Sequence, residues 1–473
     1  MSPLNSNNKV IHFAGICGTG MASLAVLLKL RGYQVRGSDK NVYPPMSDFL
    51  AQNKITVQSR FAAKNLNPAP DLVVIGNALS RGNPEVEAVL ERKLPYLSMS
   101  ELLKEYFIRG KTSLVVSGTH GKTTTSSLLA WVFESAEKAP GFMIGGIAEN
   151  FKASCRDGDG RYFITEGDEY DTAFFDKRSK FFHYLPDQLI LNNLEFDHAD
   201  IFDSLADIKK SFRLMLRLIP RNGLIVANGD DVNVQTVLES AYSPVVKFGF
   251  GKTSDVRALN LETSESGTGF EVEDKRRKES EQVKKFELKL SGAYNVRNAL
   301  GVIILARYNG ITDQTIQSAF NSFQSVRRRQ ELRGEVNGIA IYDDFAHHPT
   351  AVRETVTAIR QKHPGRRLIA VFEPRSNTSV LKIHQEVLID SFREADEVIL
   401  TTPHRLAQIP VEHRLEVPEV LKSLNDDKIP AYVFTEVNEI IEHLKTNCCF
   451  GDVVLIMSNG KFDNIHQRLL EAL

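Results

Sequence analysis

Short apolar runs alternate with amphipathic stretches along the first hundred residues. The run at 72–75 is continuous and the run at 10–14 is interrupted only by His12, whereas 21–30 and 85–92 carry apolar residues at helical spacing. Continuous apolar runs are typical of strands that are buried on both faces. Their alternation with helices predicts a parallel sheet with helices packed against it.

The same alternation returns twice further along the chain. The expected elements are strands at 114–116, 162–166, 188–191, 340–342, 368–372, 398–401 and 453–457, and helices at 126–134, 350–361 and 381–395. We expect the charge run at 273–285 to be a solvent-exposed hairpin tip. The pattern predicts an α/β protein of three domains, at 1–108, 109–325 and 326–473.

Composition and charge exclude several classes of protein. The formal charge is −1 over 473 residues, so the chain lacks the basic excess of a nucleic-acid-binding protein. No apolar run approaches the roughly 18 residues of a membrane span. The four cysteines have neither disulfide nor metal-ligand spacing. We expect a cytoplasmic protein that acts on small molecules, without nucleic-acid or membrane partners.

A glycine-rich loop, GTHGKTT at 118–124, stands between an expected strand and an expected helix. In this order, backbone N–H groups and a helix N-terminus can cradle phosphates. Lys122 would reach the terminal phosphates of ATP, and the Thr123 hydroxyl would bind Mg²⁺. Val116 replaces the usual first glycine, so the loop is a shortened variant, and an ordinary strand-to-helix turn is the alternative.

A second glycine loop, GICGTG at 15–20, follows the first expected strand. Its spacing differs from the dinucleotide fingerprint G-x-G-x-x-G. Asp39, after the next strand, could accept a ribose hydroxyl in either case. The loop predicts a bound nucleotide diphosphate. A tight turn that only packs a helix, and a dehydrogenase fused to an ATP-binding domain, are the alternatives.

Polar residues follow several strands, where open α/β sheets bind ligands. Glu166 ends one strand, and Asp197-His198 follows the next. These side chains could hold a divalent ion, or the carboxylates could cap helices. Asn295 and Asn298 lie on one helical face, where paired amides could bind the edge of an adenine ring.

Two motifs lie near the second expected domain junction: RRR at 327–329 and DDFAHHP at 343–349. An arginine brought to a γ-phosphate by a neighbouring domain can stabilise phosphoryl transfer. In this order, the motifs resemble the Mur ligase family, which joins amino acids or peptides to a UDP-linked muramic acid. The resemblance covers nearly the whole chain.

The resemblance implies a fold and a mechanism. A Rossmann-like UDP-sugar-binding domain would precede a central P-loop ATPase domain with a mainly parallel sheet and a C-terminal Rossmann-like domain for the peptide substrate. ATP would phosphorylate the lactyl carboxylate of UDP-N-acetylmuramate, and a peptide amine would then displace phosphate. The cofactors would be ATP and Mg²⁺.

The resemblance also implies roles for individual residues. The expected catalytic residues are Lys122, His198 and Arg329. The expected ATP-binding residues are Gly118, Thr119, His120, Gly121, Lys122, Thr123, Thr124, Asn295, Asn298, Arg329 and Asp344. The expected Mg²⁺ ligands are Thr123, Glu166 and His198. The expected UDP-sugar contacts are Gly15, Gly18, Thr19, Gly20, Asp39, Asn77 and Ser80. The expected peptide contacts are His347, His348, Arg375, Ser376 and Asn377.

Within the family, the segments 38–47, 76–84, 373–378 and 457–460 are similar to those of members that act in cell-wall recycling. These members join the murein tripeptide L-Ala-γ-D-Glu-meso-diaminopimelate to UDP-N-acetylmuramate. The alternative is a member that adds L-alanine in primary peptidoglycan synthesis. A silent sensor of UDP-muramyl ligands is a further alternative, although sensing needs no phosphoryl-transfer residues.

Overall fold

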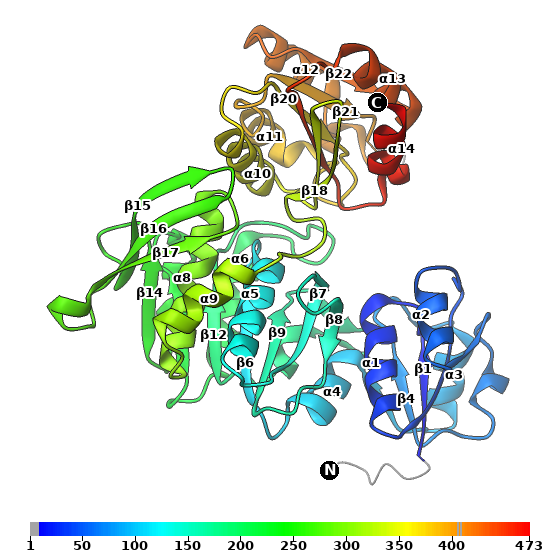
Figure 1. Ribbon diagram of the computed structural model, residues 1–473. Coiled ribbons are helices and arrows are strands. Elements are labelled where there is room, and N and C mark those ends of the chain that lie inside the picture. The colour runs from blue at the N-terminus through cyan, green and yellow to red at the C-terminus, as the bar shows by residue number, and fades with distance from the viewer. Residues whose placement is uncertain (1–8, 404–405, 407–408) are drawn as a thin grey trace.

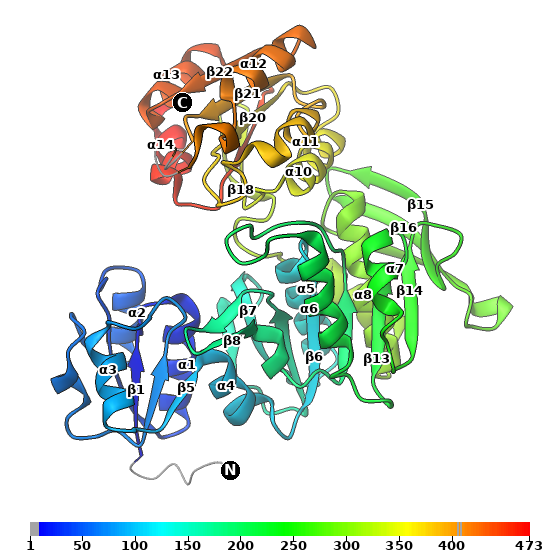
Figure 2. The same ribbon diagram turned by 180° about the vertical axis from the view of Figure 1, so that it is seen from behind.

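Three sheets, each in its own part of the chain, organise the computed structural model (Figure 1). The structure describes residues 9–403, 406 and 409–473, so the start of the expected first domain, 1–8, lies outside the described residues. Figures 1 and 2 show the N-terminal and C-terminal domains on two different sides of the central domain. The expected α/β class is confirmed.

The N-terminal domain is a five-stranded parallel sheet in the order β3-β2-β1-β4-β5. Its strands are β1 (Val10–Ala14), β2 (Gln34–Ser38), β3 (Thr56–Gln58), β4 (Leu72–Ile75) and β5 (Tyr96–Ser98). Its helices are α1 (Thr19–Leu30), α2 (Met46–Gln52), α3 (Pro84–Glu91) and α4 (Met99–Leu103). Every residue of β4 is buried, as a continuous apolar run in a parallel sheet requires. The Asn83 side chain caps α3, and Pro84 occupies its first position.

The central domain contains a ten-stranded sheet in the order β17-β16-β15-β14-β13-β12-β6-β9-β7-β8. From β15 to β7 the neighbouring strands are parallel, and β17, β16 and β8 pair antiparallel. The strands are β6 (Thr112–Ser117), β7 (Gly141–Ala148), β8 (Ala153–Arg156), β9 (Tyr162–Gly167), β12 (Gln188–Leu191), β13 (Leu224–Asn228), β14 (Val245–Gly249), β15 (Val256–Ser264), β16 (Gly267–Asp274) and β17 (Val283–Leu288). The helices are α5 (Lys122–Ser135), α6 (Leu205–Leu216), α7 (Val232–Leu238), α8 (Ala293–Tyr308) and α9 (Asp313–Ser322), and a separate hairpin is formed by β10 (Asp171–Ala173) and β11 (Asp176–Ser179).

One local expectation for the central domain is wrong, and a second, the exposed hairpin tip at 273–285, holds except at Asp274. Helix α5 begins at Lys122, not at 126, because the glycine loop leads directly into it and Ser126 Oγ donates back to the Lys122 carbonyl at 2.6 Å. The charge run at 273–285 is not wholly solvated. Asp274 is 1% exposed, and its carboxylate pairs with Arg276 and Arg307.

The C-terminal domain is a six-stranded sheet in the order β18-β19-β23-β20-β21-β22, parallel except for β18. Its strands are β18 (Glu331–Val336), β19 (Ile339–Asp344), β20 (Leu368–Phe372), β21 (Glu397–Thr401), β22 (Ala431–Phe434) and β23 (Val453–Met457). Its helices are α10 (Pro349–Lys362), α11 (Gln385–Asp390), α12 (Val417–Asp426), α13 (Val437–Asn447) and α14 (Ile465–Ala472). None of the helices in the described part of the chain combines the length and apolar character that a membrane span needs.

The helix expected at 381–395 is much shorter in the structure. Leu381 forms an isolated antiparallel bridge with Arg414, so its backbone is extended and cannot start a helix. The short turn η5 (Lys382–His384) follows, and α11 ends at Asp390 in successive tight turns. A long-range pairing therefore overrides the local helical pattern.

Candidate active site

Strand order brings three polar loops together. Strands β12, β6 and β9 are neighbours in the central sheet and run parallel, so their carboxyl ends lie at one edge. The segments 192–198 and 118–121 follow β12 and β6, and the segment 166–169 spans the end of β9 and the loop after it. The expected phosphate loop, carboxylates and imidazole therefore share one site.

The conformation of the 118–121 loop requires glycine. Gly121 has a φ of 78°, and a Cβ there would lie 2.7 Å from Asn298 Oδ1. The His120 N–H donates to Asn193 Oδ1 at 2.7 Å. The residues after β12 and the α8 helix thus fix the loop from two sides, and a larger residue at position 121 would clash.

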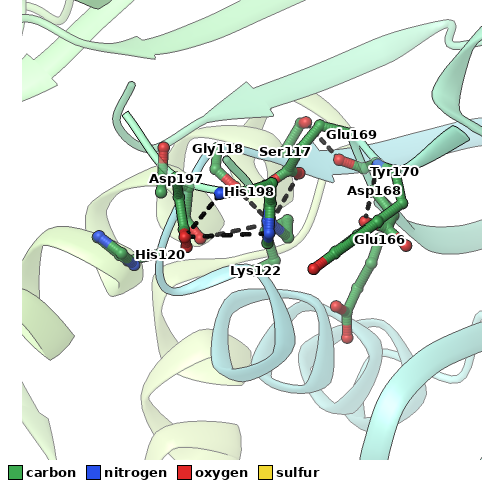
Figure 3. A network of polar contacts seen from close by, with 12 residues as sticks. Ser117, Gly118, His120, Lys122, Glu166, Asp168, Glu169, Tyr170, Asp197 and His198 are labelled. Carbon is green, nitrogen blue, oxygen red and sulfur yellow. Dashed lines mark hydrogen bonds and ion pairs between the residues drawn. The ribbon is translucent and has the colours of Figure 1, made fainter. Parts of the chain in front are cut away.

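Lys122 is held by a carboxylate that we did not predict as its partner. Its Nζ atom donates to Glu169 at 2.8 and 2.9 Å and to the Gly118 carbonyl at 2.7 Å (Figure 3). Burial would lower the pKa of Lys122, but the charges of Glu169 and Asp168 outweigh it, so the pKa is raised. The ammonium group therefore stays charged beside the loop.

Thr123 and Glu166 form the part of the site that fits a divalent cation. Thr123 Oγ1 donates to Glu166 Oε2 at 3.2 Å, and the Gly145 N–H donates to Glu166 Oε1 at 2.6 Å. Burial raises the pKa of Glu166, so a cation beside it would relieve an unfavourable buried charge. A hydroxyl and a carboxylate are the oxygen donors that Mg²⁺ prefers.

His198, the third expected Mg²⁺ ligand, contacts a different carboxylate. Its Nε2–H donates to Glu169 Oε1 at 3.0 Å, and its ring centroid lies 4.2 Å from that of Tyr170. Burial opposes a charge on the ring, but Glu169 outweighs burial and raises the pKa of His198. The residue has a φ of 57°, a strained backbone that directs the imidazole toward Glu169.

A cavity of about 1100 Å³ lies in front of this network, and its lining comes from all three domains. Pro45 contributes from the N-terminal domain, and Asn295, Arg329 and Asp344 line it together with the glycine loop. Asn298 is not among its lining residues. It is 5% exposed, and its Oδ1 accepts from Asn192 Nδ2 at 3.3 Å. Asn298 thus supports the loop, and its contact with adenine stays a prediction.

Arg329 reaches the cavity from a strained junction between the second and third domains. Its guanidinium lies 5.1 Å from the Phe345 ring centroid. The flanking residues Arg328 and Gln330 have φ of 60° and 48°, a left-handed backbone conformation that is uncommon for residues other than glycine. The Gln330 N–H donates to Asp344 Oδ2 at 2.8 Å, which ties the junction to β19.

A second cavity of about 230 Å³ adjoins the first. Its lining includes four of the expected peptide contacts, His347, Arg375, Ser376 and Asn377. Four residues line both cavities: Tyr170, Asp197, His198 and His347. His348 is not among the lining residues of either cavity and is 4% exposed, so its role as a peptide contact stays a prediction.

The expected UDP-sugar contacts lie at the carboxyl edge of the first sheet. Gly15 and Gly18 form the β1–α1 turn, whereas Thr19 and Gly20 already belong to α1. Asp39 holds the turn, because its carboxylate accepts the Cys17 N–H at 2.9 Å and the Asn41 N–H at 3.0 Å. Asn77 and Ser80 follow β4 and are exposed.

Several residues of the site lie outside our sequence predictions. Glu169 bridges Lys122 and His198, Tyr170 packs on His198, and Thr378 Oγ1 donates across the domain interface to Asp197 Oδ1 at 2.8 Å. Glu169 and Tyr170 follow a predicted strand. Their position after this strand could have identified them as candidate site residues. Thr378 gave no signal, because its partner lies 181 residues away.

Comparison with known proteins identifies relatives over the whole chain. Family models described as "Mur ligase family, catalytic domain", "Mur ligase middle domain" and "Mur ligase, glutamate ligase domain" match residues 10–110, 116–306 and 328–460. The chain is 44% identical over 465 residues, 98% of each protein, to UDP-N-acetylmuramate–L-alanyl-gamma-D-glutamyl-meso-2,6-diaminoheptandioate ligase of Escherichia coli K12. It is 32% identical, over 96% of each protein, to UDP-N-acetylmuramate–L-alanine ligase of Endomicrobium trichonymphae. The crystal structure of a murein peptide ligase from Psychrobacter arcticus 273-4 has a TM-score of 0.71, 38% identity and 98% coverage of both chains.

Proposed function

This chain belongs to the Mur ligase family, and from this membership we propose its function. The chain is an ATP-dependent ligase that joins L-Ala-γ-D-Glu-meso-diaminopimelate to UDP-N-acetylmuramate. Identity to a tripeptide ligase is 44% over nearly the full chain, compared with 32% to an L-alanine ligase. The tripeptide reaction is therefore favoured over the addition of L-alanine.

The observation that carries the proposal is the junction of two cavities at His198 and His347. In our proposal, the larger cavity holds ATP and the muramyl carboxylate, and the smaller one holds the amino end of the peptide. Arg375 pairs with Glu373 at 3.3 Å, but its side chain is 45% exposed, so it could also bind a carboxylate of the peptide. The reacting groups would then meet where the cavities join.

The proposed chemistry has two steps. A lactyl carboxylate oxygen attacks the γ-phosphorus of ATP, which gives an acyl phosphate and ADP. The peptide amine then attacks the acyl carbon, phosphate leaves, and the amide is formed with loss of one proton. Lys122 and Arg329 would balance the charge of the transferring phosphoryl group.

A divalent cation completes the proposal. Thr123 and Glu166 would hold Mg²⁺, and His198 would complete the metal-binding set. When bound, Mg²⁺ supplies positive charge to phosphate oxygens. Asn295 would bind adenine, Asp344 the ribose, and the Gly15–Gly20 turn the UDP diphosphate. We place this reaction in the cytoplasm, where ATP and UDP-sugars are available.

Phosphate release from ATP tests the proposal directly. The protein is supplied with UDP-N-acetylmuramate and either the tripeptide or L-alanine. We expect rapid release with the tripeptide and little with L-alanine. The reverse would make the chain an L-alanine ligase, and release with neither would favour a sensor. Binding of NADH without UDP-sugar binding would instead favour the dehydrogenase interpretation.

A further inference from the structure

Two histidines and a glutamate converge at the interface between the central and C-terminal domains. His120 belongs to the glycine loop, Glu195 follows β12, and His348 precedes α10. Glu195 Oε2 lies 3.5 Å from His120 Nε2 and 3.4 Å from His348 Nδ1. One donor atom from each residue lies within 4.8 Å of the other two.

The two distances to Glu195 Oε2 match a tetrahedral metal site, and the two imidazole nitrogens lie within 4.8 Å of each other. Zn²⁺ binds imidazole nitrogen and carboxylate oxygen at about 2.0–2.2 Å, which places ligand atoms roughly 3.3–3.6 Å apart at tetrahedral corners. Both distances to Glu195 Oε2, 3.5 and 3.4 Å, lie in this range. Three protein ligands would leave the fourth position for water or substrate.

The His348 imidazole is in a state that can bind metal. His348 Nε2–H donates to the Phe196 carbonyl at 3.3 Å, so Nδ1 carries the lone pair. Nδ1 lies 3.4 Å from Glu195 Oε2 and accepts the Thr350 N–H at 3.3 Å, a contact that a bound metal would displace. Metal-binding histidines usually donate their other N–H to such a carbonyl. Burial and the nearby His120 lower the pKa of His348 to about 3, which keeps the ring neutral.

His120 Nε2 adds an independent observation. The atom is buried and makes no hydrogen bond with any residue that the structure describes, and the His120 side chain is 12% exposed. Apart from its 3.5 Å contact with Glu195 Oε2, this buried nitrogen lacks a hydrogen bond, which costs free energy that a bound cation would recover. The ring also stands apart from the contacts around Lys122 (Figure 3).

We propose that His120, Glu195 and His348 form a binding site for Zn²⁺ or a similar transition metal, separate from the expected Mg²⁺ site. Two imidazoles and one carboxylate favour such ions over Mg²⁺, which prefers oxygen ligands. The site joins the glycine loop to the first turn of α10. Bound metal therefore ties the central domain to the C-terminal domain and slows any motion between them.

Titration of the full-length, chelator-treated protein with Co²⁺ tests the site. Tetrahedral Co²⁺ absorbs visible light much more strongly than octahedral Co²⁺. We expect this absorption to saturate at one Co²⁺ per chain and to disappear when Zn²⁺ is added. His348→Asn and Glu195→Gln should each weaken Co²⁺ binding by about 100-fold or more.

Glu166→Gln is the matched control, because it removes an expected Mg²⁺ ligand and leaves this cluster unchanged. The absorption should persist in Glu166→Gln. Its absence in the wild-type protein, its loss in Glu166→Gln, or its persistence in both cluster variants would each overturn the proposal. In that case the cluster is an ordinary polar contact between domains.

The thermal midpoint with and without Zn²⁺ tests the site by a second measurement, which remains useful if one variant folds poorly. Asn is itself a good N-cap, so His348→Asn should keep the cap that His348 provides to α10. Zn²⁺ should raise the thermal midpoint of the wild-type protein and that of Glu166→Gln but not that of His348→Asn or His120→Asn. Equal shifts in all four proteins would contradict a site at this cluster.

Discussion

The Nζ atom of Lys122 lies 2.8 Å from Oε2 of Glu169, whose side chain is only 3% exposed. The same carboxylate accepts from His198 at 3.0 Å. Glu169 thus holds two residues with proposed roles in the reaction, one on each side. Glu169 positions the lysine and limits its conformational freedom. A phosphate that approaches Lys122 would compete with Glu169 for the ammonium group.

Removal of Lys122 alone should destabilise the fold. Lys122→Met would leave Glu169 buried with His198 as its remaining partner, and loss of one member of a buried ion pair typically costs about 3–5 kcal/mol. The double variant Lys122→Met/Glu169→Gln carries no such unpaired charge and should recover most of the loss. Chemical denaturation measures both. Equal stability of the single and double variants would contradict the charge argument.

Lys122→Ala should also lower turnover by at least about 10²-fold, as the loss of one preorganised charge donor does. Lys152→Ala is the control, because Lys152 is 67% exposed and pairs only with Glu149 at the surface among its described ion pairs. Phosphate release under saturating substrates measures the effect. A wild-type rate in Lys122→Ala would remove the residue from the mechanism.

Replacement of Arg327 and replacement of Arg329 should lower turnover by very different factors. Both residues line the large cavity. Arg329 lies beside Phe345, whereas Arg327 is 55% exposed and already pairs with Glu149 at 2.6 Å. Arg329→Ala should reduce turnover by about 10³-fold or more, as for an arginine that stabilises phosphoryl transfer. Arg327→Ala should reduce turnover by a much smaller factor. Similar losses in both variants would indicate a general electrostatic effect.

The sequence predicts the α/β fold and the glycine loop because both depend on local patterns. Continuous apolar runs specify buried parallel strands, and the GTHGKTT segment specifies a strand-loop-helix turn. The shortened α11 could not be predicted, since the pairing of Leu381 with Arg414 joins segments distant in sequence.

The contacts that organise the site could also not be predicted from the sequence. Glu169 was visible as a member of an acidic cluster after a strand, but its contacts with Lys122 and His198 depend on strand order. The Thr378–Asp197 hydrogen bond and the Glu195–His348 pair require the packing of two domains. Such contacts follow from tertiary structure, which local spacing does not encode.

Thiol reactivity should identify Cys449 as the reactive cysteine. Burial raises the pKa of Cys17 and Cys155 to about 11 and that of Cys448 to about 12, and Cys449 is exposed. At pH 8, a thiol with a pKa of about 11 is ionised to only about one part in 10³. Mass spectrometry after brief alkylation should find the label on Cys449. Rapid labelling of Cys17 would contradict its protected position in the loop.

The stability of the fold should depend on pH through His348. Burial and the charge of His120 lower the pKa of His348 to about 3 in the folded state, compared with about 6.5 in an unfolded chain. As the pH falls below about 6.5, the unfolded state takes up the proton first, so the free energy of unfolding decreases until about pH 3.

A proton on Nδ1 would also remove the acceptor for the Thr350 N–H, which caps α10 at 3.3 Å. His348→Asn keeps a capping side chain and does not titrate, so its stability should fall less steeply over this range. The difference should reach at most about 1.4 kcal/mol per pH unit. Chemical denaturation with a chelator present, at several pH values, measures both proteins. Parallel pH profiles would show that His348 is not responsible.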